Sequence, residues 1–363
     1  MKPPTLPDYS PAELGELFTS WGFKPTHATA LLRDLLAGED LGGSESRRQP
    51  AKLLQRLEAT VPKGSSSVVM RQVAADGTTK LLLRLADGAT VETVLMPDFR
   101  ANRAAGCLSS QVGCAMGCDF CATTKSGFQR HLTTGEILEQ FIALRREAIA
   151  AGRTLQTIVF MGMGEPMLNL NAVMAAAERI ADNRLGGLGA RQITVSTVGI
   201  VPGIDALSAA SLNVNLAVSL HAPDDTTRAR LIPVGTRYPI SEVMAAVDRF
   251  QAHRPRPVTF QYCLLAGVND APAQAQQLAE IVGSRRIHVN LLRYNSTGTS
   301  LRGQEYVPSN DESSEAFATI LRNQGVVAHF RRSRGQDIDA ACGQLRRRLE
   351  SNATPSPLPF PSR

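Results

Sequence analysis

The sequence predicts an α/β protein built around a parallel β-sheet. Short apolar runs, each typical of a buried strand, occupy residues 157–161, 192–196, 214–220, 258–264 and 287–292. Most of them are separated by stretches with helical periodicity, at residues 172–181, 241–251 and 273–282. Strands that alternate with helices form parallel sheets, because each crossover helix returns the chain to the same end of the sheet. An open doubly wound sheet and a full or partial (β/α) barrel both satisfy this pattern, and residues 326–331 could close or edge the sheet.

Residues 1–62 are predicted to form an N-terminal helical module. Ser10, Pro11 and Glu13 supply an N-cap, a first-turn proline and a capping-box glutamate. Leucines continue the helical spacing to Leu36, and a Gly- and Ser-containing stretch then interrupts it. The pattern resumes from Leu53, so we expect further helix up to the end of the module.

Residues 63–100 are predicted to form a small antiparallel β meander. Its β-rich runs are separated by Asp76-Gly77 and Asp87-Gly88, and Asp-Gly between such runs is a strong hairpin signal. We therefore expect three strands here. The segment from Asp98 to Gly106 is expected to be a loop.

The remaining chain divides into a core at residues 101–345 and a basic, Pro-rich tail at residues 346–363 that is expected to be disordered. With 43% hydrophobic and 20% charged residues, the composition is that of an ordinary globular protein. No apolar run reaches the roughly 18 to 20 residues that span a bilayer, so we expect a cytoplasmic protein without membrane contact. The formal charge of +6 permits a polyanionic partner such as RNA.

Three cysteines in one short segment predict a metal centre. Cys114, Cys118 and Cys121 have the spacing C-x-x-x-C-x-x-C. An iron–sulfur cube held by three cysteines leaves one iron free to bind a ligand, whereas a structural zinc site needs four protein ligands. Cys107 could complete such a zinc site, so both kinds of centre stay open at this point.

A glycine-rich turn, Gly-Met-Gly-Glu-Pro, directly follows the run at residues 157–161. Its glycines let the backbone approach a ligand, and Glu165 can accept a hydrogen bond from an ammonium group. Polar residues also occur at the ends of later strands. They are Ser196, Ser219 with His221, and Asn295. Because the carboxyl ends of parallel strands meet at one end of the sheet, we expect these groups to face one ligand.

These segments resemble the radical S-adenosylmethionine (SAM) enzymes, and most closely the RlmN/Cfr family of RNA methyltransferases. The resemblance extends from residue 91 to about residue 345 and is carried by residues 91–94, 107–114, 160–166, 218–222, 267–270 and 337–345. It implies a partial (β/α)6 radical SAM barrel in which Cys114, Cys118 and Cys121 hold a [4Fe-4S] cluster. The residues implied to contact SAM are Gly164, Glu165, Ser196, Ser219, Leu220, His221 and Asn295.

The resemblance also implies a mechanism. Transfer of a methyl cation to an adenine ring carbon would be slow, so the cofactor must supply radical chemistry. In this family one SAM methylates a cysteine, here Cys342, and a radical from a second SAM takes hydrogen from that methyl group. The methylene radical adds to the ring, Glu92 removes the ring proton, and Cys107 forms a disulfide with Cys342. A reducing cytosol would recycle this pair, and an external electron donor would reduce the cluster.

The two branches of the family methylate different adenine carbons, C2 for RlmN and C8 for Cfr. Pro166 in the glycine-rich turn favours the RlmN branch, whereas Arg293-Tyr294-Asn295 is more similar to Cfr. We give more weight to the turn and predict methylation at C2 of an adenosine. A C8 enzyme and a non-catalytic, zinc-stabilised RNA-binding protein are the alternatives.

The resemblance implies an RNA substrate, 23S ribosomal RNA and possibly transfer RNA, and a monomeric enzyme. Arginine-rich runs at residues 331–334 and 346–348 flank Cys342, so we expect them to contact RNA phosphates. The target base has to be unpaired or extruded to reach a buried cysteine and cluster.

Overall fold

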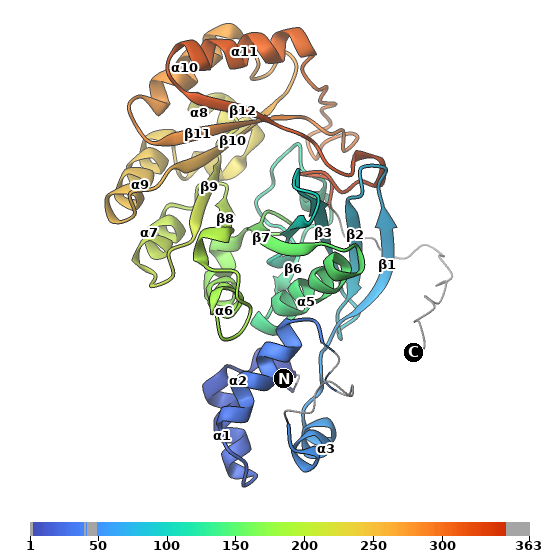
Figure 1. Cartoon of the computed structure of the whole chain (residues 1–363). Helices are drawn as coiled ribbons and strands as arrows, with labels where there is room; N and C mark the ends of the chain where they lie inside the picture. The colour runs from blue at the N-terminus through green and yellow to red at the C-terminus, as the bar shows by residue number, and fades with distance from the viewer. Residues whose placement is uncertain (1–2, 40, 42–48, 346–363) are drawn as a thin grey trace.

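The computed structural model describes residues 3–39, 41 and 49–345 of the chain, and it is organised around one ten-stranded sheet (Figure 1). The strands lie in the order β1-β2-β3-β4-β7-β8-β9-β10-β11-β12. The first three form an antiparallel meander, and β3 is also antiparallel to β4. Every pairing from β4 to β12 is parallel. The bounds are β1 (Ser67–Val73), β2 (Thr79–Arg84), β3 (Thr90–Pro97), β4 (Arg103–Cys107), β7 (Thr154–Phe160), β8 (Ile193–Thr197), β9 (Asn215–Ser219), β10 (Val258–Leu264), β11 (Ile287–Arg293) and β12 (Val327–Arg331).

The predicted α/β class is confirmed, and each apolar run named from the sequence contains or overlaps a strand of the parallel part. The run at residues 326–331 corresponds to β12, which is an edge strand. The prediction of a loop from Asp98 to Gly106 was wrong for its second half, because β4 begins at Arg103. A Cβ atom on Gly106 would lie 2.9 Å from side-chain atoms of Ile158 and Leu144. Close packing against these side chains determines the position of the strand, and its small residues give no strand signal in the sequence.

Helices follow the strands of the parallel part and cover the sheet (Figure 1). Their apolar residues face the core, as in α9, where Val243, Val247 and Phe250 are buried. The bounds in this region are α5 (Thr134–Ala150), α6 (Leu170–Ala181), α7 (Val201–Ala209), α8 (Asp225–Leu231), α9 (Ile240–His253), α10 (Pro272–Val282) and α11 (Asp311–Asn323). The described ranges contain no helix with the length and apolar character needed to span a bilayer.

The N-terminal module consists of α1 (Pro11–Ser20), α2 (Thr26–Leu36) and α3 (Ala51–Thr60), which extend from one end of the molecule (Figure 1). The predicted capping box of Ser10 and Glu13 is confirmed. The module is attached to α5, because Gly135 N donates to Asp8 Oδ1 (2.9 Å) and Arg145 donates to Leu36 O (2.9 Å).

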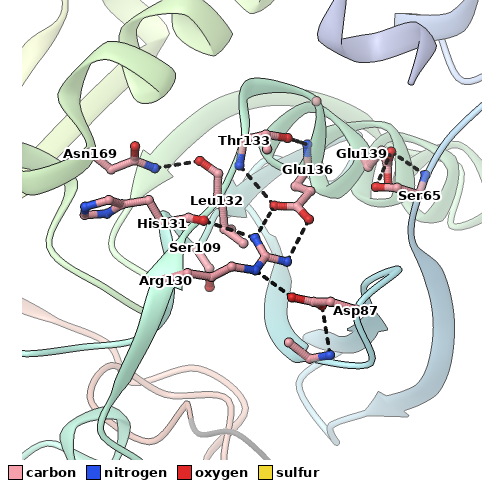
Figure 2. Close-up of polar contacts among 12 residues, drawn as sticks. Ser65, Asp87, Ser109, Arg130, His131, Leu132, Thr133, Glu136, Glu139 and Asn169 are labelled. Atoms are coloured by element: carbon pink, nitrogen blue, oxygen red, sulfur yellow. Dashed lines mark hydrogen bonds and ion pairs between the residues drawn. The ribbon is translucent and has the colours of Figure 1, made fainter. Parts of the chain in front are cut away.

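Arg130 links the meander to the start of α5, and Arg71 on β1 pairs with Glu147 further along this helix (2.8 Å). Gly77 and Gly88 adopt φ angles of 79° and 81° in the two predicted hairpin turns. At the second turn, Arg130 Nε donates to Asp87 (2.7 Å) and its two terminal nitrogens donate to Glu136 at the start of α5 (2.7 and 2.9 Å; Figure 2). Arg130 lies on β6 (Phe128–His131), which pairs with β5 (Gln111–Gly113).

After β12 the chain crosses to the meander (Figure 1). Gly335 N donates to Asp76 Oδ2 (3.2 Å), Ala75 N donates to Asp337 Oδ2 (2.9 Å), and Lys80 Nζ donates to Asp339 O (3.1 Å). We call residues 332–345 the crossing segment. The predicted tail and the arginine run at residues 346–348 lie outside the described residues.

Candidate active site

Most of the predicted site residues line one cavity of about 150 Å3 in the parallel part of the sheet. The cysteine loop, the glycine-rich turn, later strand ends and the crossing segment all contribute to it. The predicted residues in the lining are Cys114, Cys118, Cys121, Gly164, Glu165, Ser196, Ser219, His221, Asn295 and Cys342. Leu220, Glu92 and Cys107 are buried nearby but are not part of that lining.

The cysteine loop is held by hydrogen bonds that do not involve a ligand. Thr124 Oγ1 donates to the carbonyl oxygens of Cys118 (3.1 Å) and Cys121 (2.9 Å), which fixes the loop against the start of α4 (Ala122–Lys125). Asp119 accepts from Tyr306 OH (2.7 Å) and from the backbone of Arg302 (3.2 Å). These hydrogen bonds fix the shape of the cysteine loop.

Burial raises the pKa of the Cys114 thiol to about 12 and that of Cys118 well above its usual range. Such thiols give up their protons when a cationic centre compensates the thiolate charge. Across the described ranges, no three His, Cys, Asp or Glu side chains lie close enough together to hold a single ion. A [4Fe-4S] cube bonds each thiolate to a different iron, so it does not require three sulfur atoms to converge on one point.

The glycine-rich turn presents Glu165 to the cavity. Gly164 has a φ of 98°, and a Cβ there would lie 2.5 Å from Gln111 Cβ, so only glycine fits. The carboxylate of Glu165 accepts from Met167 N (3.1 Å) and Val198 N (2.9 Å). Burial nevertheless raises its pKa to about 7, although these hydrogen bonds oppose the shift. Because its pKa is close to neutral pH, this buried carboxyl can be ionised and pair with a cationic group of a ligand.

His221 at the end of β9 is fixed as a neutral hydrogen-bond donor. Its Nδ1 accepts from Cys263 N (2.9 Å), which leaves the proton on Nε2. Burial, with a further contribution from Arg228, lowers the pKa of the imidazole to about 3. Asn295 is also held in place, because its Oδ1 accepts from Gln336 Nε2 (2.6 Å).

Sequence reasoning missed Gln261, which lines the cavity from β10. In the described part of the chain, its buried Oε1 has no hydrogen-bond partner. A buried acceptor without a partner is unfavourable, so this atom is suited to a donor on a bound ligand. The available signal was a single glutamine within the apolar run at residues 258–264. Cys263, on the same strand, is buried and also lines the cavity.

Cys342 and Cys107 differ in their surroundings. Cys342 lines the cavity and is exposed, so the expectation of a buried cysteine was wrong. It lies next to Gly343, whose carbonyl accepts from Ala122 N of the cysteine-loop helix (2.7 Å). Cys107 is buried at the end of β4. Burial raises the pKa of its thiol to about 12; proximity to Cys342 raises it further, and Arg331 lowers it. All six cysteines are free thiols, so the predicted disulfide is not formed in this structure.

Glu92 lies in the interior beside the cavity. Its carboxylate forms an ion pair with Lys80 (3.1 Å), and both side chains are almost completely buried. The Ser109 hydroxyl links the backbone of Glu92 to the glycine-rich turn. Ser109 Oγ donates to Glu92 O (2.6 Å) and accepts from Met163 N (2.8 Å). The strand that carries Glu92 is thereby attached to the turn that carries Glu165.

Comparison with known proteins identifies the family. The model of the Radical SAM superfamily matches residues 108–279. The chain is 64% identical over 343 residues to the probable dual-specificity RNA methyltransferase RlmN 1 of Opitutus terrae, covering 94% of this chain and 97% of that protein. The chain belongs to the RlmN family.

Other relatives of the RlmN family and a solved structure agree with this assignment. The dual-specificity RNA methyltransferase RlmN 1 of Myxococcus xanthus is 40% identical and covers 95% of each chain. The crystal structure of a radical SAM methyltransferase from Sphaerobacter thermophilus superimposes with a TM-score of 0.89 at 41% identity, covering 94% of this chain and 99% of that one. The chain is thus an RNA methyltransferase of the radical SAM type, and the alternative of a non-catalytic zinc protein is rejected. The predicted family and fold are confirmed.

Proposed function

We propose that this RlmN-family enzyme methylates C2 of an adenosine in RNA, with Cys342 as the methyl carrier. The observation that carries the proposal is the position of Cys342, which is exposed to the cavity that the three-cysteine loop and Glu165 also line. A thiol in this position can receive a methyl group and present it to a base entering from outside.

Radical SAM membership implies a [4Fe-4S] cluster and SAM, and the residues that line the cavity suit both groups chemically. Cys114, Cys118 and Cys121 would hold the cluster. Glu165 and Gln261 Oε1, which has no partner among the described residues, are suited to donors on SAM, and Gly164 leaves room for its close approach. Ser196, Ser219, the backbone at Leu220, His221 and Asn295 complete the proposed contacts. When bound, the cluster and SAM supply the methyl group and the one-electron chemistry that an adenine carbon requires.

The remaining roles belong to residues around the cavity. Arg331 favours the thiolate form of Cys107, which suits Cys107 as the group that releases the product by forming a disulfide with Cys342. Lys80 holds a positive charge against Glu92 and favours its ionised form, as a base for the ring proton must be. Disulfide recycling and cluster reduction both require external reductants.

The choice of C2 rests on Pro166, which follows Glu165 as in the RlmN branch. Ribosomal RNA, 23S in particular, and transfer RNA are the substrate classes that the family resemblance implies. We further propose that the enzyme acts as a cytoplasmic monomer.

Product analysis tests the proposal. RNA treated anaerobically with the reconstituted enzyme, SAM and a reductant is digested to nucleosides, and the methyladenosine isomers are separated by chromatography and mass spectrometry. We expect 2-methyladenosine, and none from the Cys342→Ala variant. If 8-methyladenosine is the sole product, the C2 assignment is wrong and the radical mechanism stands. A Cys342→Ala variant that still methylates RNA would exclude the methyl-carrier role.

A further inference from the structure

Phe99 is the most exposed large apolar side chain in the described part of the chain, with 80% of its surface accessible. It lies in the loop between β3 and β4. Backbone hydrogen bonds from Asp98 N to Arg103 O (2.9 Å) and from Arg103 N to Arg100 O (3.0 Å) close this loop. The ring is therefore presented by a defined turn. A single exposed apolar residue is ordinary on protein surfaces, so its meaning depends on its neighbours.

Those neighbours are two arginines of the crossing segment. The guanidinium carbons of Arg332 and Arg334 lie 5.7 and 5.4 Å from the centre of the Phe99 ring. Cation–π contacts of this kind orient the ring but leave most of it open, as its exposure shows. Asp76, an acid close to Arg334, accepts from the backbone amides of Thr78 and Gly335. We call Phe99, Arg332 and Arg334 the aromatic–arginine platform.

The platform lies next to the proposed active site. Arg331, directly before Arg332 in the chain, lines the cavity and contacts Met161 Sδ through its Nη1 (3.4 Å). The crossing segment that carries both platform arginines also carries Cys342 into the cavity. The platform therefore begins at the residue that directly follows a cavity-lining residue in the chain.

An open aromatic face flanked by guanidinium groups is the surface on which unpaired bases stack. The guanidinium groups can also bind the adjoining phosphates. An adenine that enters the cavity must leave its own base stack, so its neighbours in the RNA are left with an open face. We propose that the aromatic–arginine platform stacks an unpaired base adjacent to the target adenosine. This inference rests on the proposed function.

A binding experiment with the full-length, cluster-reconstituted protein tests the platform. The probe is a short unstructured RNA with one central adenosine, together with versions in which one neighbouring base at a time is replaced by an abasic site. We expect Phe99→Ala to weaken binding roughly five- to a hundredfold, and Phe99→Trp to retain it, because stacking needs only an aromatic face. The matched control is Ile149→Ala, which removes another exposed apolar side chain, on α5.

The abasic probes identify the contact. One abasic position should weaken binding to the unsubstituted protein by a similar factor, with no further loss in Phe99→Ala, because both changes remove the same stacking contact. At saturating RNA, Phe99→Ala should methylate at close to the normal rate, since the effect lies in KM.

Several results would overturn the platform. The first is that the unsubstituted protein methylates RNA and the Phe99→Ala variant binds and methylates RNA equally well. This result would leave the proposed function intact. Another is an equal loss of binding with every abasic probe, which would indicate phosphate contacts in place of stacking. If the unsubstituted protein does not methylate RNA at all, the proposed function fails as well.

Discussion

At the scale of single residues, the two distant cysteines have environments that match two different roles. Cys342 is exposed to the cavity, whereas Cys107 is buried with its thiol pKa raised to about 12. A protonated, buried thiol does not compete with Cys342 for the methyl group, since the thiolate is the nucleophile. Arg331 opposes part of this pKa shift, which suits Cys107 to the later, product-releasing step that we propose for it.

Alanine variants should separate these roles. We expect Cys342→Ala to abolish RNA methylation, and Cys107→Ala to accumulate RNA covalently attached to Cys342, because the group that releases the product is missing. Gel electrophoresis before and after nuclease treatment measures the adduct. Iron content is the control, and both variants should retain the cluster. Loss of iron from both would show that these cysteines are structural.

The proposed contact between Glu165 and SAM predicts that SAM binding depends on pH. The pKa of Glu165 is raised to about 7 by burial, so the carboxyl is mainly protonated below that pH and ionised above it. Only the ionised form pairs with an ammonium group, so affinity for SAM should rise about tenfold as pH rises from one unit below the pKa to one unit above it, and then level off. Equilibrium dialysis at constant cluster content measures this.

The variant Glu165→Gln keeps the shape of the side chain and removes its charge. It should bind SAM more weakly and with no dependence on pH over the same interval. If the affinity for SAM still depends on pH in this variant, the group that titrates is not Glu165.

At the scale of secondary-structure elements, Arg130 joins the meander to α5 (Figure 2). The Glu136 side chain is only 3% exposed, and without Arg130 its charge would be buried beside its own capping box alone. Asp87, the other partner, is 39% exposed, so water already screens that pair.

Arg130→Met should therefore lower the free energy of unfolding by about 2 to 3 kcal/mol, and Asp87→Asn by less than about 1 kcal/mol. The hydrogen bond from Arg130 is the main cause that holds the pKa of Asp87 below its usual 3.8. The ionised Asp87 therefore makes its full contribution to the free energy of unfolding at neutral pH, and this contribution is lost as pH falls through the lowered pKa. Urea titrations at pH 7 and at acidic pH measure both effects. Asp205→Asn, which breaks the exposed pair with Arg249, is the control and should change little. Equal losses from the arginine and control variants would contradict the argument.

Elements with local signals could be predicted from the sequence. Ser10 and Thr133 cap α1 and α5 as their capping boxes indicate, and Asp-Gly marks both turns of the meander. Strand β4 could not be predicted, because its residues are small and its place is set by Leu144 and Ile158 packing over Gly106. Local patterns report the preferences of the chain, whereas close packing of a glycine depends on distant residues.

Some residues of the candidate site could likewise be predicted from the sequence, and others could not. Strand-end residues such as Ser196 and His221 could be placed on one cavity from the parallel pattern alone. Gln261 could not, because only the structure shows that its Oε1 is buried without a partner among the described residues. The roles of Cys107, Cys342 and Glu92 came from family resemblance, because no local pattern distinguishes them from core residues.

At the scale of the whole molecule, the crossing segment connects the two ends of the sheet order. Its hydrogen bonds join residues far apart in sequence, as between Ala75 and Asp337, which are 262 positions apart. Nothing in the sequence pattern indicates these contacts. They determine where Cys342 lies, because the segment is attached to the meander before it and to the cysteine-loop helix after it, through Thr123 Oγ1 and Leu345 O (2.6 Å).

Asp337→Ala removes one of these attachments without changing a residue that lines the cavity. We expect the cluster content to be unchanged and RNA methylation to fall about ten- to a hundredfold, because a displacement near 1 Å of a reacting group has an effect of that size. Mass spectrometry of the Cys342 peptide measures methylation of the cysteine, and the rate of RNA methylation measures the transfer to RNA. Asp205→Asn again serves as the control. The variant Asp337→Asn should restore part of the rate, since its side-chain oxygen can still accept from Ala75 N. Full activity in Asp337→Ala would show that the meander contacts do not position Cys342.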